Sequence, residues 1–366
     1  MTPIRSQMIL RLEHAIKEFD GCLQLLAILA GLCGSRIEAD GSMHREVYAL
    51  GDSAFRAGDK SQNPFLFQLN DKWRLVNMDS TRKYNFWGDE EPLNVIASQR
   101  FPEVNGEYFS TLPGKEYMKP LVVPHEKLDK KFRWFYTYYE YTATYHELPD
   151  KGPVPLSKFL TPEEQQIWFR GDEAAYAGLN GMELDNKLDD IGSKFWQWYN
   201  CTQFEISFRI ISQLVENQGD TTYLHCMEKQ KESVSKKVLS ANENFDGSPE
   251  AICSMFDEAC RTKYFLGLYA SNKDAMDKKF EKDSEVSALF YYAIKFELTM
   301  PGKLIATNAD SQSDDGIAWR VDAFRLVTGD YLLTAESKMI NYWAFGVTLL
   351  LILACFGICL KRYRRK

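Results

Sequence analysis

The sequence predicts an α+β protein: a mixed β-sheet ectodomain interrupted by a helical insertion and followed by one C-terminal transmembrane helix. Three observations predict this class. Residues 341–360 contain no charged side chain, residues 184–215 carry apolar side chains at steps of three and four, and aromatic and β-branched runs lie on both sides of that helical pattern. The predicted segments, in order, are a signal segment (1–35), a β-rich part (36–155), the helical insertion (156–283), a closing β-rich part (284–340), the transmembrane helix (341–360) and a basic tail (361–366).

The uncharged stretch 341–360 has the length of a membrane span. At 1.5 Å per residue, a helix of this length extends about 30 Å, the thickness of a bilayer's hydrocarbon core. Tyr342 and Trp343 lie at one boundary, and five Lys or Arg residues crowd residues 361–366 at the other. Because basic residues accumulate on the cytoplasmic side, we expect a single-pass protein of the cell membrane with a cytoplasmic C-terminus and a large extracytoplasmic domain.

The N-terminal part is typical of an exported chain. Residues 22–33 are mostly apolar; such a stretch is too short to span a bilayer but has the length of a signal-peptide core. Gly34 and Ser35 follow as a small-residue cleavage zone. Two alternatives stay open: a lipid-modified Cys33, and an uncleaved, buried segment.

Residues 36–155 are expected to form strands. The runs 65–69, 73–76 and 93–96 are short and apolar, with Gly, Asn, Asp and Pro between them. The richest run, 132–145, consists largely of aromatic residues and Thr and is predicted to be one central strand covered on both faces. Alternation places Phe132, Trp134, Tyr136 and Tyr138 on one face and Phe135, Tyr139 and Tyr141 on the other. Trp134, Tyr136 and Tyr138 are the candidate ligand-binding residues, because flat rings can stack on a sugar or a peptide; large rings also commonly fill a core.

After residue 155 the period becomes helical. Thr161 begins a capping box that Glu164 closes. The stripe in 184–215 predicts one long helix, and the pattern continues through residues 223–239 and 249–269, whereas the charged residues 273–283 are expected to be a solvated stretch.

Strand patterns return in the last quarter of the chain. The predicted strands are residues 290–299, 304–307, 316–324 and 331–335. We favour one discontinuous domain in which the helical insertion interrupts a sheet; two separate β modules on either side of a helical one are the alternative.

Candidate chemistry is sparse. Gly51-Asp52-Ser53 is similar to the nucleophile block of GDS-type ester hydrolases, in which the serine follows a strand. Such enzymes also need an Asp-x-x-His base late in the fold, and no histidine follows His225. An ordinary turn is the simpler interpretation. The histidines after residue 35 are scattered, and none forms a pair at zinc-ligand spacing. We expect no metal and no cofactor.

Four cysteines lie between the two apolar stretches: Cys201, Cys226, Cys253 and Cys260. An even number in an exported region permits disulfides. Cys253 and Cys260 are about 10 Å apart within one helix, too far to bridge each other. Cys201 lies on the apolar stripe and suits a buried thiol. The pairing stays open.

The charge of the chain limits its partners. The five basic residues of the tail contribute +5 to a net charge of −7, so the remainder carries −12. Proteins draw their affinity for nucleic acids from Lys and Arg on phosphates, so nucleic-acid binding is disfavoured.

Five short segments carry a resemblance to a known group of proteins. They are Phe296-Glu-Leu-Thr-Met-Pro-Gly-Lys303, Ala306-Thr-Asn-Ala309, Ala318-Trp-Arg-Val321, Ala335-Glu-Ser337 and Asn341-Tyr-Trp-Ala-Phe345. Together they resemble uncharacterised, C-terminally anchored envelope proteins of Bacteroidetes bacteria. The resemblance implies bacterial origin and an extracytoplasmic domain on a C-terminal anchor, and it implies no activity. The sequence therefore favours a binding or assembly module of the cell envelope with a protein partner. The alternatives are a membrane-anchored serine ester hydrolase using Ser53 and a structural subunit of an inner-membrane complex.

Overall fold

The computed structural model describes residues 31–84, 90–149, 152–171, 177–241, 245–313 and 316–364. These residues divide into two compact units. The first, which we call the β unit, comprises Ala30–Tyr145, Ile294–Val321 and Tyr331–Lys366; the second, the helical unit, comprises His146–Ala293 and Asp322–Asp330.

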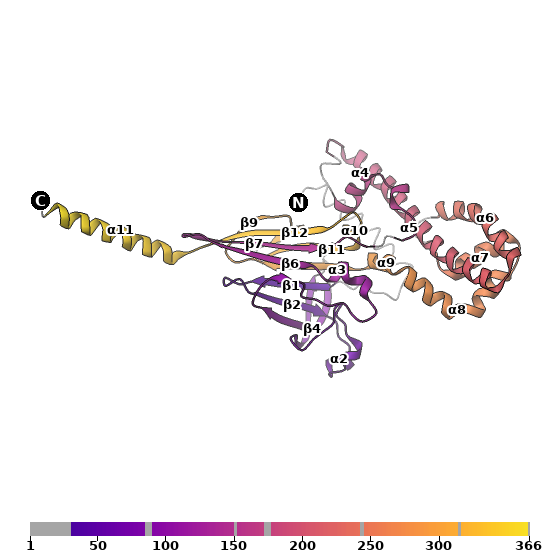
Figure 1. The fold of residues 1–366 in the computed structure, drawn as a ribbon, viewed down its shortest axis with the longest axis horizontal. Helices are drawn as coiled ribbons and strands as arrows, with labels where there is room; N and C mark the ends of the chain where they lie inside the picture. The colour runs from indigo at the N-terminus through magenta and orange to yellow at the C-terminus, as the bar shows by residue number, and fades with distance from the viewer. Residues whose placement is uncertain are drawn as a thin grey trace. The chain divides into compact units, whose positions relative to one another are not determined.

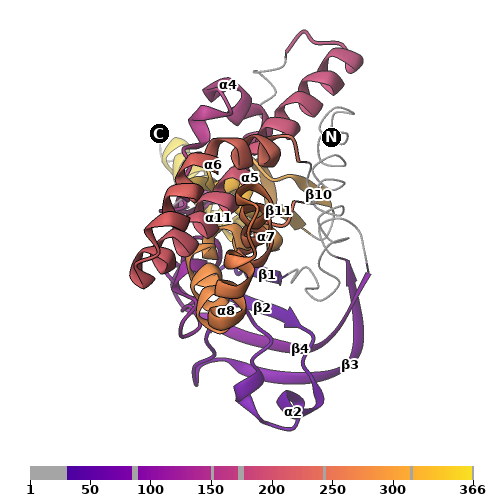
Figure 2. The same cartoon turned by 90° about the vertical axis from the view of Figure 1, so that its right-hand side faces the viewer.

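The strands form two sheets. Their bounds are β1 (Gly31–Ile37), β2 (Met43–Ala49), β3 (Arg74–Tyr84), β4 (Glu90–Phe101), β5 (Asn105–Gly106), β6 (His125–Phe132), β7 (Tyr136–Tyr145), β8 (Ala293–Thr299), β9 (Lys303–Thr307), β10 (Ser311–Ser313), β11 (Gly316–Asp322) and β12 (Tyr331–Ile340). One sheet has seven strands in the order β10-β11-β8-β1-β2-β4-β3, and the other has five in the order β5-β6-β7-β12-β9. Figure 2 shows β1, β2, β4 and β3 side by side in the larger sheet.

Both sheets combine strands from before and after the helical insertion. β1 pairs in parallel with β8 in the larger sheet, and β7 pairs antiparallel with β12 in the smaller one. The fold is therefore α+β with an interrupted β part, as the sequence predicts.

The inner faces of the two sheets pack on each other. The ring of Tyr141 in β7 stacks against Phe296 in β8, with centroids 6.3 Å apart. The hydroxyl of Tyr139 donates to the carbonyl of Ala39, between β1 and β2, at 2.7 Å. Alternating burial along β7 follows from this packing, because successive side chains of a strand point to opposite faces.

The helices are mostly in the helical unit. Their bounds are α2 (Ser53–Arg56), α3 (Lys119–Val122), α4 (Pro162–Gln165), α5 (Gly181–Gln218), α6 (Thr221–Leu239), α7 (Pro249–Cys260), α8 (Tyr264–Asp283), α9 (Glu285–Ala288), α10 (Ala323–Leu326) and α11 (Tyr342–Tyr363), with the 3₁₀ turns η1 (Lys60–Gln62), η2 (Glu116–Met118), η3 (Leu156–Lys158) and η6 (Leu289–Tyr291) and the π-helical turn η4 (Gln166–Arg170). α5 contacts α6, α7 and α8 (Figure 2).

The core of the helical unit contains a cluster of aromatic rings. Phe195 in α5 packs against Trp198, Phe290 and Phe324, with centroids 5.4–5.9 Å apart. Phe324 belongs to α10, which lies between β11 and β12 in sequence. α10 belongs to the helical unit because its one ring, Phe324, completes that core.

Several predicted helices have the expected bounds. The capping box at Thr161 is present at the start of α4, and α5 and α6 cover the stripe and the segment that follows it. The helical pattern predicted for 249–269 is divided between α7 and α8, because α7 ends at Cys260 and the next residue, Arg261, has a left-handed φ of 53° that cannot continue a helix. Residues 273–283, expected to be a solvated stretch, continue α8.

The single strand predicted for 132–145 is wrong. β6 ends at Phe132, residues 133–135 form a turn, and β7 begins at Tyr136. β7 is central, between β6 and β12, but only one of its faces is fully buried. Other strand predictions fail locally. Of residues 65–69, only Phe67 forms a bridge; residues 290–292 precede β8 as a 3₁₀ turn and one further residue, and 323–324 open α10.

The boundary predicted for the signal segment, residue 35, falls inside a strand. β1 pairs with both β2 and β8, so cleavage after Ser35 would remove most of a central strand. Cys33 is buried there, and burial raises the pKa of its thiol to about 11. The boundary at residue 35 and a lipid on Cys33 are therefore wrong for this fold. Residues 1–30, which hold the rest of that segment, lie outside the described residues.

Candidate functional site: the sheet end beside the membrane helix

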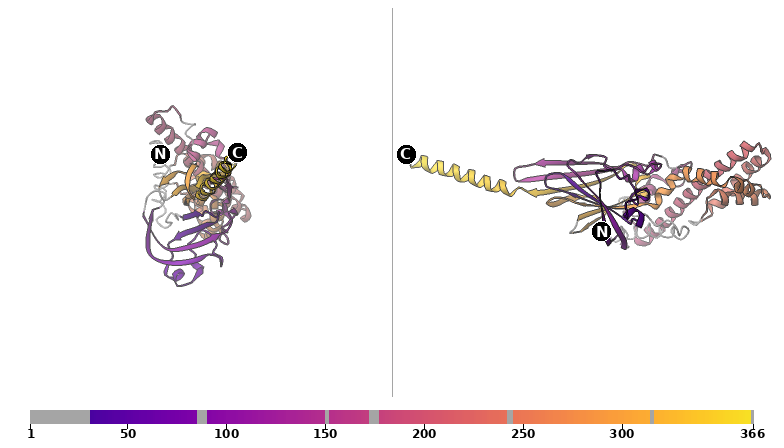
Figure 3. Two further views of the ribbon diagram at one scale, coloured as in Figure 1. Left: turned by 90° about the vertical axis from the view of Figure 1, so that its left-hand side faces the viewer. Right: turned by 90° about the horizontal axis from the view of Figure 1, so that it is seen from below.

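α11 is long and apolar enough to cross a membrane. It has 22 residues, of which only Ala344 is buried. Within the described ranges it is the one helix that passes a length-and-hydropathy test for a span. The predicted transmembrane helix is confirmed to this extent. Figures 1 and 3 show α11 leaving the end of the five-stranded sheet, directly after β12.

A single residue, Asn341, joins β12 to α11. It is buried, and its Nδ2 donates to the carbonyls of Arg133, at 2.9 Å, and Trp134, at 3.3 Å. Its Oδ1 accepts from the hydroxyl of Thr137 at 3.0 Å. Its backbone N–H donates to the carbonyl of Phe135 at 2.9 Å. The start of α11 is thus bound to the β6–β7 turn rather than attached through a flexible linker.

Aromatic side chains surround this joint. Phe132 stacks on Trp343, with centroids 6.2 Å apart, and Trp134 meets the same ring edge-on at 5.4 Å. Phe135 packs against Phe345 at 4.6 Å. We call these five residues the aromatic collar. They bring the hairpin of β6 and β7 into direct contact with the first two turns of α11.

Charged side chains on the outward face of the five-stranded sheet are ordered in rows. Strand register places Lys131 opposite Tyr138, Tyr138 opposite Lys338, and Lys338 opposite Lys303. We call Lys131, Lys303 and Lys338 the lysine row. One same-face step further from α11, register aligns three carboxylates, the acidic row, which consists of Asp129, Glu140 and Glu336.

The two rows interact. Lys131 Nζ donates to Glu140 at 2.5 Å, and this hydrogen bond raises the pKa of Lys131. Lys338 Nζ lies 5.6 Å from the centre of the Tyr136 ring, a cation–π distance. The end of the sheet nearest α11 is therefore basic and aromatic, and the acidic groups are set back from it.

The predicted ligand-binding residues are only partly brought together. Tyr136 and Tyr138 lie on the half-exposed face of β7, with ring centroids 6.4 Å apart. Trp134 lies in the turn instead, and its Nε1 donates to Thr348 Oγ1 in α11 at 2.7 Å. The expectation of three rings on one strand face is wrong because the chain turns at residues 133–135.

A buried ion pair lies between the sheets. Arg45 in β2 donates to both carboxylate oxygens of Glu126 in β6, at 2.8 and 2.6 Å, and both side chains are 0% exposed. Ser35 Oγ accepts from Arg45 Nε at 2.9 Å. Tyr141 donates to Glu126 at 2.6 Å, and burial together with this carboxylate raises the pKa of Tyr141. With no exposed member, the cluster holds the sheets together rather than reaching a ligand.

The candidate nucleophile Ser53 is exposed and opens α2 shortly after β2, the strand-to-helix position that the hydrolase hypothesis expects. Asp52 is occupied as the N-cap, since it accepts from the backbone N–H of Phe55. No described histidine is bonded to Ser53. The turn interpretation fits these contacts better than a catalytic one.

Metal-ligating side chains do not gather in the part of the chain that the structure describes, where no group of three His, Cys, Asp or Glu residues could hold an ion. His146 instead pairs with Asp330 at 3.2 Å, on the surface of the helical unit.

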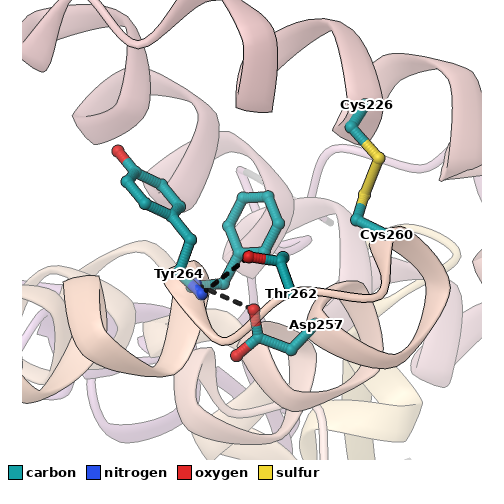
Figure 4. Close-up of a disulfide and its surroundings, with 6 residues drawn as sticks. Cys226, Asp257, Cys260, Thr262 and Tyr264 are labelled. Carbon is teal, nitrogen blue, oxygen red and sulfur yellow. Dashed lines mark hydrogen bonds between the residues drawn. A yellow bond between two sulfur atoms is a disulfide. The ribbon is translucent and has the colours of Figure 1, made fainter.

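A disulfide links α6 to the end of α7 through Cys226 and Cys260, whose Cα atoms are 6.2 Å apart (Figure 4). Next to it, Asp257 accepts from the backbone N–H of Phe265, and Thr262 accepts from that of Tyr264, so the start of α8 is fixed beside the bridge. The sequence left this pairing open. Cys201 is buried, as its place on the stripe predicts.

Sequence reasoning missed Asn341, the lysine row and the Arg45–Glu126 pair. Only Asn341 had a local signal, because it is a polar residue directly before an apolar run and Asn side chains readily bond backbone groups. Comparisons of the chain with protein-family models, with curated proteins and with solved structures found no match. The resemblance to Bacteroidetes envelope proteins therefore stays a prediction.

Proposed function

We propose that this chain is a single-pass protein of a bacterial cell membrane, with its β and helical units outside the cytoplasm and its C-terminus inside. In this proposal it works as a binding or assembly module for a protein partner of the cell envelope. The observation that carries the proposal is the joint at Asn341. Because no linker separates β12 from α11, the β unit stays at the bilayer surface and meets partners there.

Two features support the extracytoplasmic side. The Cys226–Cys260 bridge belongs to a type of bond that persists in oxidising compartments and is rare in the cytosol. The basic residues that follow the span are typical of the cytoplasmic side.

The outward face of the five-stranded sheet is the expected partner surface. On the part of this face that is distant from α11, Leu332 is 45% exposed and lies opposite Thr144 of β7. We therefore expect the partner to contact the sheet around Leu332.

Cysteine labelling in spheroplasts tests the orientation. Met182 in α5 and Tyr363 at the end of α11 are both strongly exposed, so Met182→Cys and Tyr363→Cys form a matched pair. A membrane-impermeant maleimide should label the first in intact spheroplasts and the second only after permeabilisation, relative to the unsubstituted chain. The reverse pattern would overturn the orientation.

Photo-crosslinking in living cells tests the partner surface. A benzophenone amino acid replaces Leu332 in β12 or, as the control, Val76 in β3 of the other sheet, both exposed aliphatic residues on strands. We expect a discrete protein adduct from position 332 alone. Equal yields from the two positions, or none from 332 in correctly inserted protein, would argue against a binding module that uses this face.

A further inference from the structure

We propose that the aromatic collar and the lysine row form a second membrane contact. The tip of the β6–β7 hairpin enters the interfacial layer of the bilayer beside α11, and the lysine row lies against the phosphates of anionic phospholipids. This inference rests on α11 as a span. It depends neither on which side of the membrane holds the domain nor on the protein partner proposed above.

The depth of the hairpin follows from its contact with α11. Trp134 Nε1 donates to Thr348, which lies six residues beyond Tyr342, the first residue of the helix. At 1.5 Å per residue this is about 9 Å along the helix axis. A turn that contacts the span at this position cannot remain in bulk water when α11 crosses the bilayer.

The carbonyl groups of the turn and the indole N–H of Trp134 have partners inside the protein. The carbonyls of Arg133 and Trp134 accept from Asn341 Nδ2, and the carbonyl of Phe135 accepts from the Asn341 backbone. The indole N–H of Trp134 is bonded as well. Backbone that loses contact with water must have such partners, because no water in lipid can replace a missing hydrogen bond. These groups of the turn can therefore leave water without losing a hydrogen-bond partner.

The collar presents apolar surface where the membrane interface must lie. Phe132 is 55% exposed and Trp343 is 54% exposed, although they stack on each other. Aromatic rings concentrate at the headgroup level of membrane proteins. The surface continues directly into the exposed apolar side chains of α11, so lipid is the occupant that covers both.

The spacing of the charged rows matches the headgroup layer. Side chains on one face of a strand repeat every two residues, about 7 Å, so the lysine row lies about 7 Å from the last row, Tyr136 and Ile340. The headgroup region adds roughly 5–8 Å on each side of the hydrocarbon core. Lysines at this height reach lipid phosphates, and the acidic row lies about 7 Å further out.

The first experiment measures depth in full-length protein reconstituted into vesicles of phosphatidylcholine and phosphatidylglycerol. The chain carries Cys22→Ala, Cys355→Ala and Cys359→Ala, since Cys33, Cys201 and Cys253 are buried and Cys226 and Cys260 are bonded to each other. An environment-sensitive fluorophore is attached at Trp134→Cys or, as an independent second site in the collar, at Phe132→Cys. We expect blue-shifted emission and quenching by nitroxides on the lipid chains.

The control is Leu50→Cys, which is exposed and follows the end of β2 opposite to the β1–β2 turn. Its label should emit as in water and escape quenching. Water-like emission without quenching from both collar positions, matching Leu50, would overturn the proposal while leaving the orientation and partner tests of the preceding section unaffected.

The second experiment tests the lysine row. A label at Tyr138→Cys should be quenched by nitroxides on the lipid headgroups. Replacing Lys131, Lys303 and Lys338 by Glu removes three attractions to anionic lipid and adds three repulsions. In anionic vesicles it should lower the ratio of protein with the hairpin in the interface to protein with the hairpin in water by at least about fivefold per lysine. The matched triple variant replaces Lys60, Lys72 and Lys115, three exposed residues outside the lysine row, by Glu and should leave that ratio unchanged. Equal effects of the two triple variants would refute a headgroup contact at this row.

Discussion

The buried Arg45–Glu126 pair gives a prediction whose size follows from its surroundings. Both side chains are fully buried, and the guanidinium donates two bonds to the carboxylate. Replacing Glu126 by Gln, or Arg45 by Met, leaves the other charge buried without a counter-charge. Such changes cost about 3–5 kcal/mol, a large share of a typical stability of about 5–15 kcal/mol.

Removing both charges together should be much milder. In Arg45→Met/Glu126→Leu no uncompensated charge remains, and the site is lined by Phe109 and Phe296, whose ring centres lie 5.0 and 5.7 Å from the guanidinium carbon. The remaining penalty comes mainly from the Tyr141 hydroxyl, whose lost acceptor costs about 1–3 kcal/mol, and in part from Ser35, which loses its donor Arg45. Adding Tyr141→Phe should remove most of that penalty.

Urea unfolding of the detergent-solubilised chain, followed by tryptophan fluorescence, measures these differences. The double-mutant cycle should give a coupling energy of at least about 2 kcal/mol, because each single change exposes the cost of the other charge. Single variants that lose less than about 1 kcal/mol, or losses that simply add in the double variant, would refute the view that the pair is one electrostatic unit.

Three further predictions concern the rest of the chain. Reducing the Cys226–Cys260 bridge, which closes a separation of 34 residues, should lower the stability of the helical unit by about 3–4 kcal/mol. Cys226→Ala should abolish the effect of reductant on the unfolding midpoint. A midpoint that still responds to reductant in this variant would contradict the pairing. The backbone N–H of Glu147, and His146, hold the pKa of Asp330 below its usual value. The contribution of Asp330 to the free energy of unfolding is therefore present above its unfolded pKa of about 3.9 and is lost as pH falls through the lower folded value. Asp330→Asn should reduce the loss of stability at acid pH, and an unchanged loss would contradict this prediction. Asn341→Ala should speed tryptic cleavage after Arg133 in membranes, whereas the control Asn77→Ala, which removes one exposed bond to Arg56, should not. Equal cleavage in the two variants would show that the bonds of Asn341 do not hold the turn.

Local patterns in the sequence predicted the elements whose causes are local. The charge-free run, the apolar stripe and the capping box at Thr161 each depend on residues within a few turns of one another, and α11, α5 and α4 follow them. The alternation of side chains along β7 could also be predicted from the sequence, and Tyr139 and Tyr141 do share the buried face.

The features missed depend on partners far apart in sequence. The turn at 133–135 contains no Gly, Pro or Asn; its hydrogen-bond donor is Asn341, more than two hundred residues later. Arg45 and Glu126 are separated by 81 residues, so no local sequence pattern near either residue predicts the pair. The signal boundary failed for the same reason: β1 is held by β8, at the far side of the helical insertion.

The order of the rows decides how the five-stranded sheet meets the membrane. If its outward face lay flat on the bilayer, Asp129, Glu140 and Glu336 would press against anionic headgroups together with the lysines, and the attraction and repulsion would largely cancel. If the sheet stands on its end, the lysine row meets the phosphates while the acidic row lies about 7 Å further away. This is close to one Debye length of about 8 Å at physiological salt, so screening reduces the repulsion of the acidic row to less than about half. The bonds of Asn341 to the turn hold the same end of the sheet at α11. Charge and geometry therefore favour the end-on arrangement, which leaves the distant part of the outward face, around Leu332, free for a protein partner.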